Sequence, residues 1–274
     1  MPELPEAETI ARDLDARAAG HTVARVHVTR SDILAPGTTR TRLSRALRGR
    51  RITSVGRRGK NVVLAFEDGW RLVVNLGMTG RIVVSDAPMA AALEHVAARF
   101  DLEDGRALLY DDARRFGRLD LRDAEGWKTR SAQLGVEPLE HAFTPAWLHA
   151  ATRHSRVPLR NWLLDQRQIA GVGNIYANEA LFGAGVRPTR RAHRLTRPEA
   201  VRLHEAVRAV LTEAIRSRGT TLNDYRDAGG RAGGFQFRLR VYDREGLPCV
   251  QCSAPIKRRV LTNRSVFYCP SCQR

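Results

Sequence analysis

Two Cys-x-x-Cys pairs stand close together near the end of this 274-residue chain. Cys249 and Cys252 form the first pair, Cys269 and Cys272 form the second, and sixteen residues separate the pairs. This spacing is typical of a zinc ribbon, in which four thiolates surround the ion and a β-hairpin joins the pairs. Two disulfides are the alternative, which an intracellular protein disfavours. Four protein ligands leave no position for water or substrate, so we expect one structural zinc ion and a catalytic group elsewhere.

The chain carries a large excess of positive charge, with 46 lysines and arginines against 29 acidic residues and a net charge of +17. Such an excess favours a polyanionic partner, and nucleic acid before a membrane surface. Ribosomal proteins and basic membrane anchors share this composition, and a GC-rich genome also enriches arginine. No apolar run approaches the roughly 18 residues of a membrane span, and the first residues lack the pattern of a signal peptide. We therefore expect a soluble, cytoplasmic and nucleoid-associated protein with no membrane partner.

The hydrophobic pattern of the first half indicates one helix followed by strands. Residues 3–19 predict a helix, with Pro5 in its first turn, Glu6 and Glu8 near its positive end and Gly20 after it. About eight short segments rich in Val, Ile and Leu follow without intervening helices, which indicates a β-sandwich. These predicted strands are residues 21–28, 50–56, 61–67, 71–77, 81–86, 98–104, 106–112 and 118–123.

Helical periodicity replaces the strands in the second half of the chain. The expected fold class is therefore α+β with several domains. Helices are predicted over residues 144–153, 157–166, 174–183 and 197–217. The predicted division is an N-terminal helix and β-sandwich over 1–135, a linker over 136–150, a helical domain over 151–228, and a loop with a metal-bound tail over 229–274.

The segment before one of these helices has the composition of a phosphate-binding turn. Gly171 and Gly173 permit a close backbone approach, and the helix start presents unpaired N–H groups to an anion. Asn174 is predicted to cap the helix, to bind a phosphate, or both. An ordinary helix entry is the alternative for the glycine pair. In the tail, Arg264 and the basic cluster at 257–259 suit a phosphate backbone, with a solvated basic turn as the alternative.

Several motifs follow one another along the chain: PELPEAET at 2–9, RRGK at 57–60, LGMTG at 76–80, RRFG at 114–117, GVGNIY at 171–176 and the two cysteine pairs. Together they make the chain resemble the bacterial formamidopyrimidine-DNA glycosylases. The resemblance covers the whole chain in the expected order, and the combination is highly specific. The related endonuclease VIII group usually has Gly at the position of Leu4, which favours the formamidopyrimidine branch.

The resemblance implies that Pro2 is a nucleophile, once removal of Met1 exposes its secondary amine. The reference pKa of an N-terminal amine lies far below that of a lysine side chain, so more of it is neutral at pH 7. Pro2 then attacks C1′ of the damaged nucleotide, displaces the base and forms a Schiff base. Glu3 is implied as the acid/base, Glu6 as a positioning acid, and Lys60 as a catalytic lysine that contacts phosphates beside the lesion. Complementing the helix dipole is the alternative for both glutamates, and a solvated turn is the alternative for Lys60.

The resemblance also implies a set of DNA-binding residues. The target base is extruded into a pocket, and Met78, Arg114 and Phe116 match the wedge that fills the gap. Arg114 is implied to select cytosine opposite the lesion, whereas a core position is the alternative for Met78. Further DNA contacts are implied for His95, Asn174, Tyr242 and Arg264.

The implied function is a bifunctional DNA glycosylase and AP lyase that excises 8-oxoguanine and formamidopyrimidines from duplex DNA and cuts the strand by β,δ-elimination. A monomer suffices for this reaction. The helical domain is then a helix–two-turn–helix DNA-binding domain, and the loop after residue 229 closes over the lesion. Two alternatives stay open: an endonuclease VIII-like glycosylase for oxidised pyrimidines, and a catalytically silent lesion-binding protein. Pro2, Glu3 and Lys60 together argue against the silent alternative, because binding alone needs no free N-terminal proline.

Departures from the family pattern put the base preference in doubt. Asn75 stands where the family often has His, Ala113 replaces a proline, and two extra residues lie within 95–104. The segment DAGGRAGGFQF at 227–237 replaces the usual DGxPGxF pattern of the closing loop. More glycine and no proline predict a more mobile loop.

Overall fold

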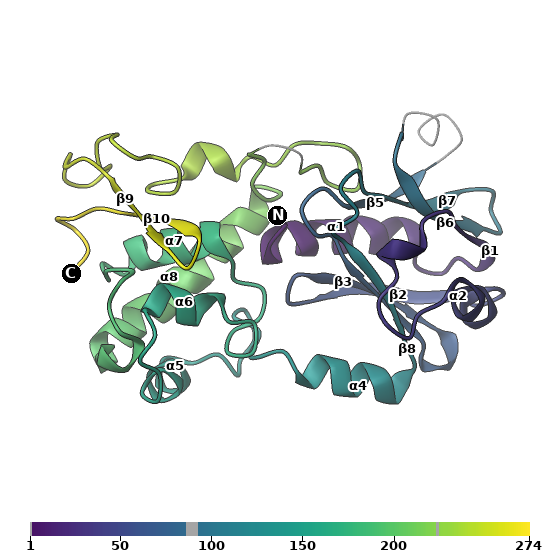
Figure 1. The fold of residues 1–274 in the computed structure, drawn as a ribbon, viewed down its shortest axis with the longest axis horizontal. Coiled ribbons are helices and arrows are strands. Elements are labelled where there is room, and N and C mark those ends of the chain that lie inside the picture. Colours follow the sequence, from purple (N-terminus) through teal and green to yellow (C-terminus); the bar gives the residue numbers. More distant parts are fainter. Residues whose placement is uncertain (1, 86–92, 223–224) are drawn as a thin grey trace. The chain divides into compact units, whose positions relative to one another are not determined.

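The computed structural model describes residues 2–85, 93–222 and 225–274 (Figure 1). These residues form two compact units. The first holds the chain up to Gln133 together with Arg218–Gly233, and the second holds Leu134–Ser217 together with Gly234–Arg274. The glycine-rich segment that ends at Gly233 therefore belongs to the first unit, although it follows the helices of the second in sequence.

The strands of the first unit are β1 (Val23–Val28), β2 (Ile52–Arg58), β3 (Asn61–Phe66), β4 (Arg71–Asn75), β5 (Arg81–Ser85), β6 (Val96–Leu102), β7 (Ala107–Asp111) and β8 (Arg118–Arg122). Among the described residues they pair into two antiparallel sheets, ordered β2-β3-β4-β8 and β1-β6-β7-β5. Both sheets and the helix α1 (Leu4–Ala18) contribute to one core, to which Leu14, Leu64 and Phe100 belong. The predicted β-sandwich is confirmed.

Among the described residues, one α-helix of the first unit interrupts the series of strands and another follows it, so the prediction of strands without intervening helices was wrong. Helix α2 (Arg40–Leu47) separates β1 from β2, and α4 (Ala124–Ala132) follows β8. Each begins at a side-chain cap, from Thr39 and from Asp123. Helix α4 buries none of its residues, so it has no apolar stripe from which a helical period could be detected. Short 3₁₀ turns lie at η1 (Ser31–Ile33) and η2 (Glu67–Gly69).

The second unit contains the four helices predicted from periodicity. They are α5 (Pro145–Thr152), α6 (Leu159–Leu164), α7 (Asn174–Gly183) and α8 (Arg197–Arg216), with short 3₁₀ turns at η3 (Ala192–Arg194) and η4 (Phe235–Arg238). Helix α8 begins at a capping box, in which Thr196 N donates to Glu199 Oε2 at 2.9 Å and Glu199 N donates to Thr196 Oγ1 at 3.4 Å. Its buried face, which includes Leu203 and Leu211, has the period expected for a helix packed on one side.

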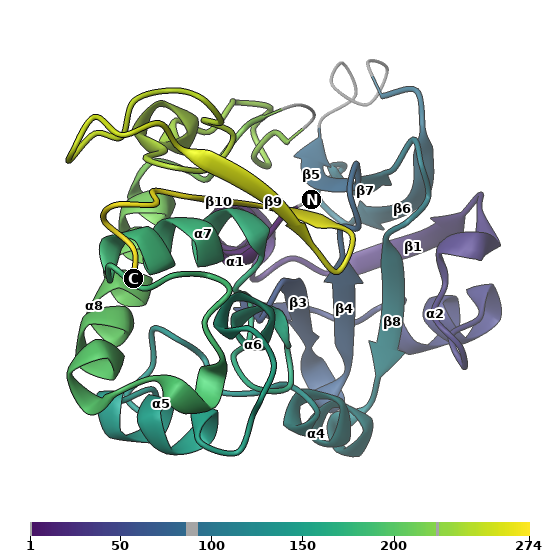
Figure 2. The same cartoon turned by 60° about the vertical axis from the view of Figure 1, so that its left-hand side comes forward.

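The predicted hairpin between the cysteine pairs is present, as β9 (Lys257–Leu261) and β10 (Arg264–Tyr268). Thr262 and Asn263 form the two-residue turn with positive φ of 45° and 59°, the sign that tight hairpin turns require. Figure 2 shows the hairpin lying beside α7. Within the described part of the chain, no helix is long and apolar enough to cross a membrane.

Candidate functional site

Pro2 and Glu3, the first described residues, are buried in the first unit. Pro2 and Glu3 immediately precede α1, and Glu3 and Glu6 are only 4% and 2% exposed. The two oxygens of Glu6 accept from different backbone groups: Oε2 from Glu3 N at 2.8 Å and Oε1 from Thr220 N at 2.7 Å. Glu6 therefore links the start of α1 to a segment more than two hundred residues later. Met1, whose removal the amine chemistry requires, lies outside the described residues.

Lys60 lies in the tight turn between β2 and β3, after Gly59 with φ of +60°. Arg57, almost fully buried, donates from Nη1 to Gly59 O at 3.0 Å and from Nε to Glu8 Oε2 at 2.9 Å. Burial alone would raise the pKa of Glu8, but hydrogen bonds and charge from Arg57 and Arg12 hold that pKa below its usual value. The charged pair thus ties the turn of Lys60 to the helix that follows Pro2.

The three predicted wedge residues lie on two neighbouring loops of the first unit, residues 76–80 and 113–117, which we call the wedge loops. Met78 is 43% exposed and Phe116 is 54% exposed, and the guanidinium of Arg114 lies 4.7 Å from the centre of the Phe116 ring. The loops meet at their glycines, since a Cβ on Gly77 would lie 2.5 Å from the backbone nitrogen of Gly117. Large exposed apolar side chains next to an arginine suit insertion into a base stack.

His95 is exposed and lies just before β6. Its backbone nitrogen donates to Asp111 Oδ1 at 2.8 Å, and its side chain lines a hollow together with Ala113 and Arg115. His95 therefore borders the wedge loop that carries Arg114.

In the second unit Asn174 does not cap α7, contrary to one of its two predicted roles. The N-cap residue is Gly173, and Asn174 is the first residue of the helix. Its Oδ1 accepts from Arg160 Nη2 at 2.6 Å, and its Nδ2 donates to Ser265 O at 3.0 Å. Arg160 is fully buried and needs an acceptor for its charge, which Asn174 supplies. The contact with Ser265 also places Asn174 next to Arg264 at the start of β10.

Tyr242 is half-buried, and its ring packs at 5.1 Å from that of Phe267 in β10. Its backbone nitrogen donates to Glu179 Oε1 at 2.8 Å. The fully buried Glu179 also accepts from Arg240 N and Val241 N, so it fixes three consecutive residues to α7. The sequence analysis assigned no role to Glu179. A signal was available, since this acid directly precedes the apolar residues Ala180–Phe182 within the same helix.

A second acid that sequence reasoning missed lies in the glycine-rich segment of the first unit. Asp227 is 1% exposed and accepts from the backbone nitrogens of Gly229 and Arg231, each at 2.9 Å. Arg218 donates from Nε to Asp227 at 2.7 Å and also pairs with Asp13 of α1. The carboxylate of Asp227 therefore holds this turn through hydrogen bonds, in a segment where the family pattern has a proline.

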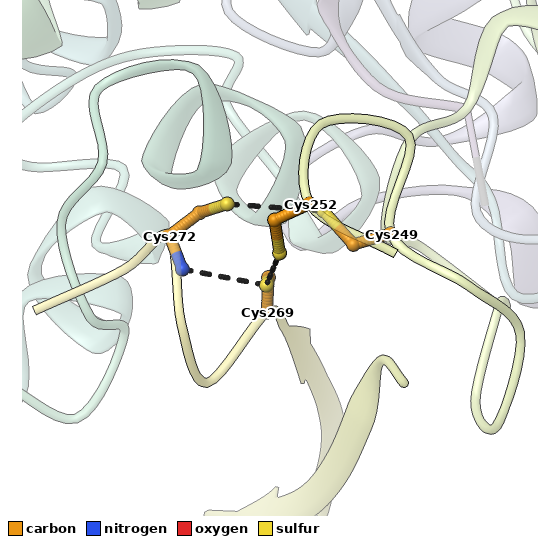
Figure 3. A group of neighbouring side chains, drawn as sticks. All are labelled: Cys249, Cys252, Cys269 and Cys272. Carbon is orange, nitrogen blue, oxygen red and sulfur yellow. Dashed lines mark hydrogen bonds between the residues drawn. The ribbon is translucent and has the colours of Figure 1, made fainter. Parts of the chain in front are cut away.

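The four cysteines converge on one point in the second unit, as Figure 3 shows. Their sulfurs all lie within 4.8 Å of one another, with 3.9 Å between Cys249 and Cys272 and 3.4 Å between Cys252 and Cys269. No disulfide joins these four described residues. A tetrahedral zinc ion with bonds of about 2.3 Å would separate its sulfurs by about 3.8 Å, so the donor set and its size fit zinc.

Models of known protein families match three parts of the chain. They are the formamidopyrimidine-DNA glycosylase N-terminal domain over residues 1–119, the formamidopyrimidine-DNA glycosylase H2TH domain over 134–226, and a zinc finger found in FPG and IleRS over 246–274. The zinc-finger match agrees with the thiolate geometry, and the predicted structural zinc site is confirmed.

Similarity to individual proteins extends over the full length. The chain is 44% identical to the formamidopyrimidine-DNA glycosylase of Chloroflexus aggregans, over 100% of this chain and 98% of that protein. A crystal structure of the MutM (Fpg) protein from Thermus thermophilus is 43% identical with a TM-score of 0.87, covering 99% of this chain and 98% of the other. A Lactococcus lactis Fpg mutant, crystallised with DNA containing Fapy-dG, is 29% identical with a TM-score of 0.91, covering 100% of both chains.

Proposed function

The chain belongs to the formamidopyrimidine-DNA glycosylase family, and we propose that it excises oxidised purines from duplex DNA with Pro2 as its nucleophile. The resemblance predicted from the motifs is thereby confirmed, together with the three-part α+β fold. The observation that carries the proposed chemistry is the buried cluster of Pro2, Glu3 and Glu6 at the start of α1. Removal of Met1 would leave a secondary amine at this buried position, in the same short stretch of chain as two buried carboxyl groups.

The proposed reaction begins with Met1 removed, because an acylated Pro2 nitrogen has no nucleophilic lone pair. The amine attacks C1′ and loses its proton as the bond between C1′ and the damaged base breaks, and the C1′–O4′ bond of the sugar ring then opens to give the iminium and a protonated O4′ hydroxyl. Glu3 exchanges protons with the sugar and the leaving base. Because the amine is secondary, the iminium is permanently charged and withdraws electrons during β,δ-elimination, which cuts the strand on both sides of the sugar. Glu6 holds the backbone of Glu3 in place through its contact at 2.8 Å.

The remaining predicted residues are proposed to bind DNA. Lys60, held by its tethered turn, contacts phosphates beside the lesion, while Met78, Arg114 and Phe116 occupy the gap left by the extruded base. Phosphate contacts are proposed for His95, Asn174, Tyr242 and Arg264. We further propose that the enzyme acts as a monomer, and that its DNA substrate places it in the cytoplasm with the nucleoid.

We propose a functional division into a catalytic sandwich over 1–135, a linker over 136–150, a helix–two-turn–helix domain over 151–228 and a loop with the zinc finger over 229–274. The compact units divide the chain differently, since Leu134–Ser217 packs with Gly234–Arg274, and Arg218–Gly233 packs in the first unit with Ala228 in its core. The bond from Thr220 N to Glu6 supports a role of the Arg218–Gly233 segment beside the proposed catalytic residues.

Trapping of the covalent intermediate tests the proposal. Protein whose mass shows that Met1 is absent is incubated with borohydride and duplexes carrying 8-oxoguanine, a formamidopyrimidine, thymine glycol or an abasic site. We expect an adduct with the oxidised purines and the abasic site, none with wild type that keeps an N-terminal extension, and slower trapping with Pro2→Gly, whose primary amine can still form a Schiff base. Faster trapping on thymine glycol would instead assign the chain an oxidised-pyrimidine preference. Absence of an adduct on all four duplexes would refute the enzymatic assignment.

A further inference from the structure

Asp112 is a buried carboxylate that has no part in the proposed chemistry. It directly follows β7, is 1% exposed, and accepts three hydrogen bonds. Its Oδ1 accepts from Thr79 Oγ1 at 2.6 Å, and its Oδ2 accepts from Gly117 N at 2.9 Å and from Tyr110 OH at 3.1 Å. A buried carboxylate that accepts three hydrogen bonds stabilises the one arrangement in which all three donors reach it, because any other arrangement leaves a buried charge without its hydrogen bonds.

Two of the three donors to Asp112 come from the wedge loops, one from each, and the third, Tyr110, lies in β7. Thr79 is one residue after Met78 in the first loop, and Gly117 is one residue after Phe116 in the second. The Thr79 hydroxyl that donates to Asp112 also accepts from Arg114 N at 3.2 Å, which extends the same network to the third wedge residue. Each of the three wedge side chains is therefore within one residue of a group tied to this carboxylate.

The surrounding atoms leave the network little freedom to rearrange. A Cβ on Gly80 would lie 2.7 Å from the Tyr110 hydroxyl, and one on Gly117 would lie 2.6 Å from Asn75 O. Burial, and next the charge of Asp112, raise the pKa of Tyr110 far above its usual value, so this hydroxyl stays a donor. Ala113, directly after Asp112, replaces the proline that would restrict the second loop, so the hydrogen bonds carry more of the ordering here.

We propose that Asp112 is the positioning residue of the wedge, which fixes the two loops against each other and so determines how readily the damaged base leaves the stack. This inference rests on the proposed function. Asp112 does not touch the reacting atoms, so its removal slows extrusion of the base and leaves the later bond-breaking steps intact. Misplacing Arg114 also weakens discrimination of the base opposite the lesion.

The test compares two substrates under single-turnover conditions. A duplex with 8-oxoguanine opposite cytosine requires extrusion of a stacked base, whereas a preformed abasic site has no base to extrude. Asp112→Asn should slow excision of 8-oxoguanine about tenfold or more, because a charged acceptor is lost from a buried network. It should change cleavage of the abasic strand by less than about twofold, and should lower the preference for cytosine over adenine opposite the lesion.

The matched control is Asp120→Asn. Asp120 is also a buried acid of the first unit, but its ion-pair partners, Arg122 at 2.8 Å and Arg130 at 3.8 Å, lie in β8 and α4 rather than in the wedge loops. The control should leave both rates near the wild-type values. Milder variants keep the test valid if Asp112→Asn folds poorly: Thr79→Val should reproduce the selective loss, and Thr79→Ser, which keeps the hydroxyl, should restore excision. 2-Aminopurine fluorescence beside the lesion should report slower base opening in the same variants.

Equal losses on both substrates, no loss on either, or the same selective loss in Asp120→Asn would each overturn the positioning role. Failure of the proposed function is distinct, because wild-type protein would then cleave neither substrate.

Discussion

Glu179 provides a direct measure of how strongly one buried acid holds the helix–two-turn–helix unit together. Its carboxylate, with no exposed surface, accepts from Arg240 N at 3.0 Å, Val241 N at 2.9 Å and Tyr242 N at 2.8 Å, and it lies 3.5 Å from Arg240 Nε. Glu179→Ala would remove the acceptor and leave these three donors facing an apolar cavity. The perturbation is local, since all four residues belong to the second unit.

The expected magnitude follows from how buried each donor is. Val241 is fully buried, so leaving its N–H unpaired should lower the free energy of unfolding by about 2 kcal/mol. Arg240 and Tyr242 are half-buried, so water can partly replace the lost acceptor and the loss should be about 1 kcal/mol for each. With the loss of charge pairing to Arg240, the total is about 3–5 kcal/mol, the usual range for breaking a buried ion pair by removing one partner. Glu179→Gln keeps one oxygen and should cost about 1–2 kcal/mol.

Native-state hydrogen exchange of the 239–243 peptide is the appropriate assay, because it reports opening of this segment without requiring the two units to unfold together. Protection of the Val241 and Tyr242 amides should fall by about two to four orders of magnitude in Glu179→Ala. Glu205→Ala, an exposed acid on α8, is the control and should change protection by less than about threefold. A loss in Glu179→Ala no larger than in this control would refute the reasoning.

Three further predictions concern charge and metal. The pKa of Glu8 is lowered in the folded protein, so its carboxylate stabilises the fold above its unfolded pKa of about 4.3, and this stabilisation is lost as the pH falls through the folded pKa. Tm measured from pH 7 to pH 3 should therefore fall less in Glu8→Gln than in wild type. Parallel curves for the two proteins would contradict this prediction. Chelating zinc should unfold the tail and so abolish DNA binding, measured by fluorescence anisotropy, and adding zinc should restore it. Activity in zinc-free protein would contradict the structural role of the ion. Arg264→Ala should weaken binding to every duplex and lower the salt slope by about one, whereas Arg48→Ala, at the exposed residue directly after α2, should not. An effect of Arg264→Ala confined to lesion-bearing DNA would contradict a phosphate contact.

The parts that could be predicted from the sequence are those whose partners are close along the chain. A Cys-x-x-Cys pair brings two sulfurs to one corner through local geometry, so its spacing alone indicates a metal site. Thr196 and Glu199 form a capping box within one helical turn, and the apolar period of α8 lies within a single helix. The hairpin needs only two strands and a two-residue turn.

The parts that could not be predicted depend on surroundings. Helix α4 buries none of its residues, so no apolar period marks it. Asn174 has the residue type of a cap, but the buried charge of Arg160 competes for its oxygen, and the cap position falls to Gly173. The glycines of the closing loop predict greater mobility, and this stays a prediction. The anchor of that turn, Asp227, lies nine residues from its donor Arg218, a separation that matches no helix or strand period and so gives no signal in the sequence.

Buried carboxylates are the clearest example of what residue type leaves undetermined. Glu6, Asp112 and Glu179 each accept from backbone N–H groups, and for Asp112 and Glu179 these groups belong to segments that carry predicted site residues. The acceptor and donor are 214, 5 and 63 residues apart in the three cases, and the donor is a group that every residue except proline possesses. No local motif can therefore encode the contacts of Glu6 with Thr220 and of Glu179 with Tyr242, whose donors lie 214 and 63 residues away. Glu6 is the clearest case: its two oxygens accept from Glu3 N, close in sequence, and from Thr220 N in a distant segment, and only the folded chain brings that second donor to it.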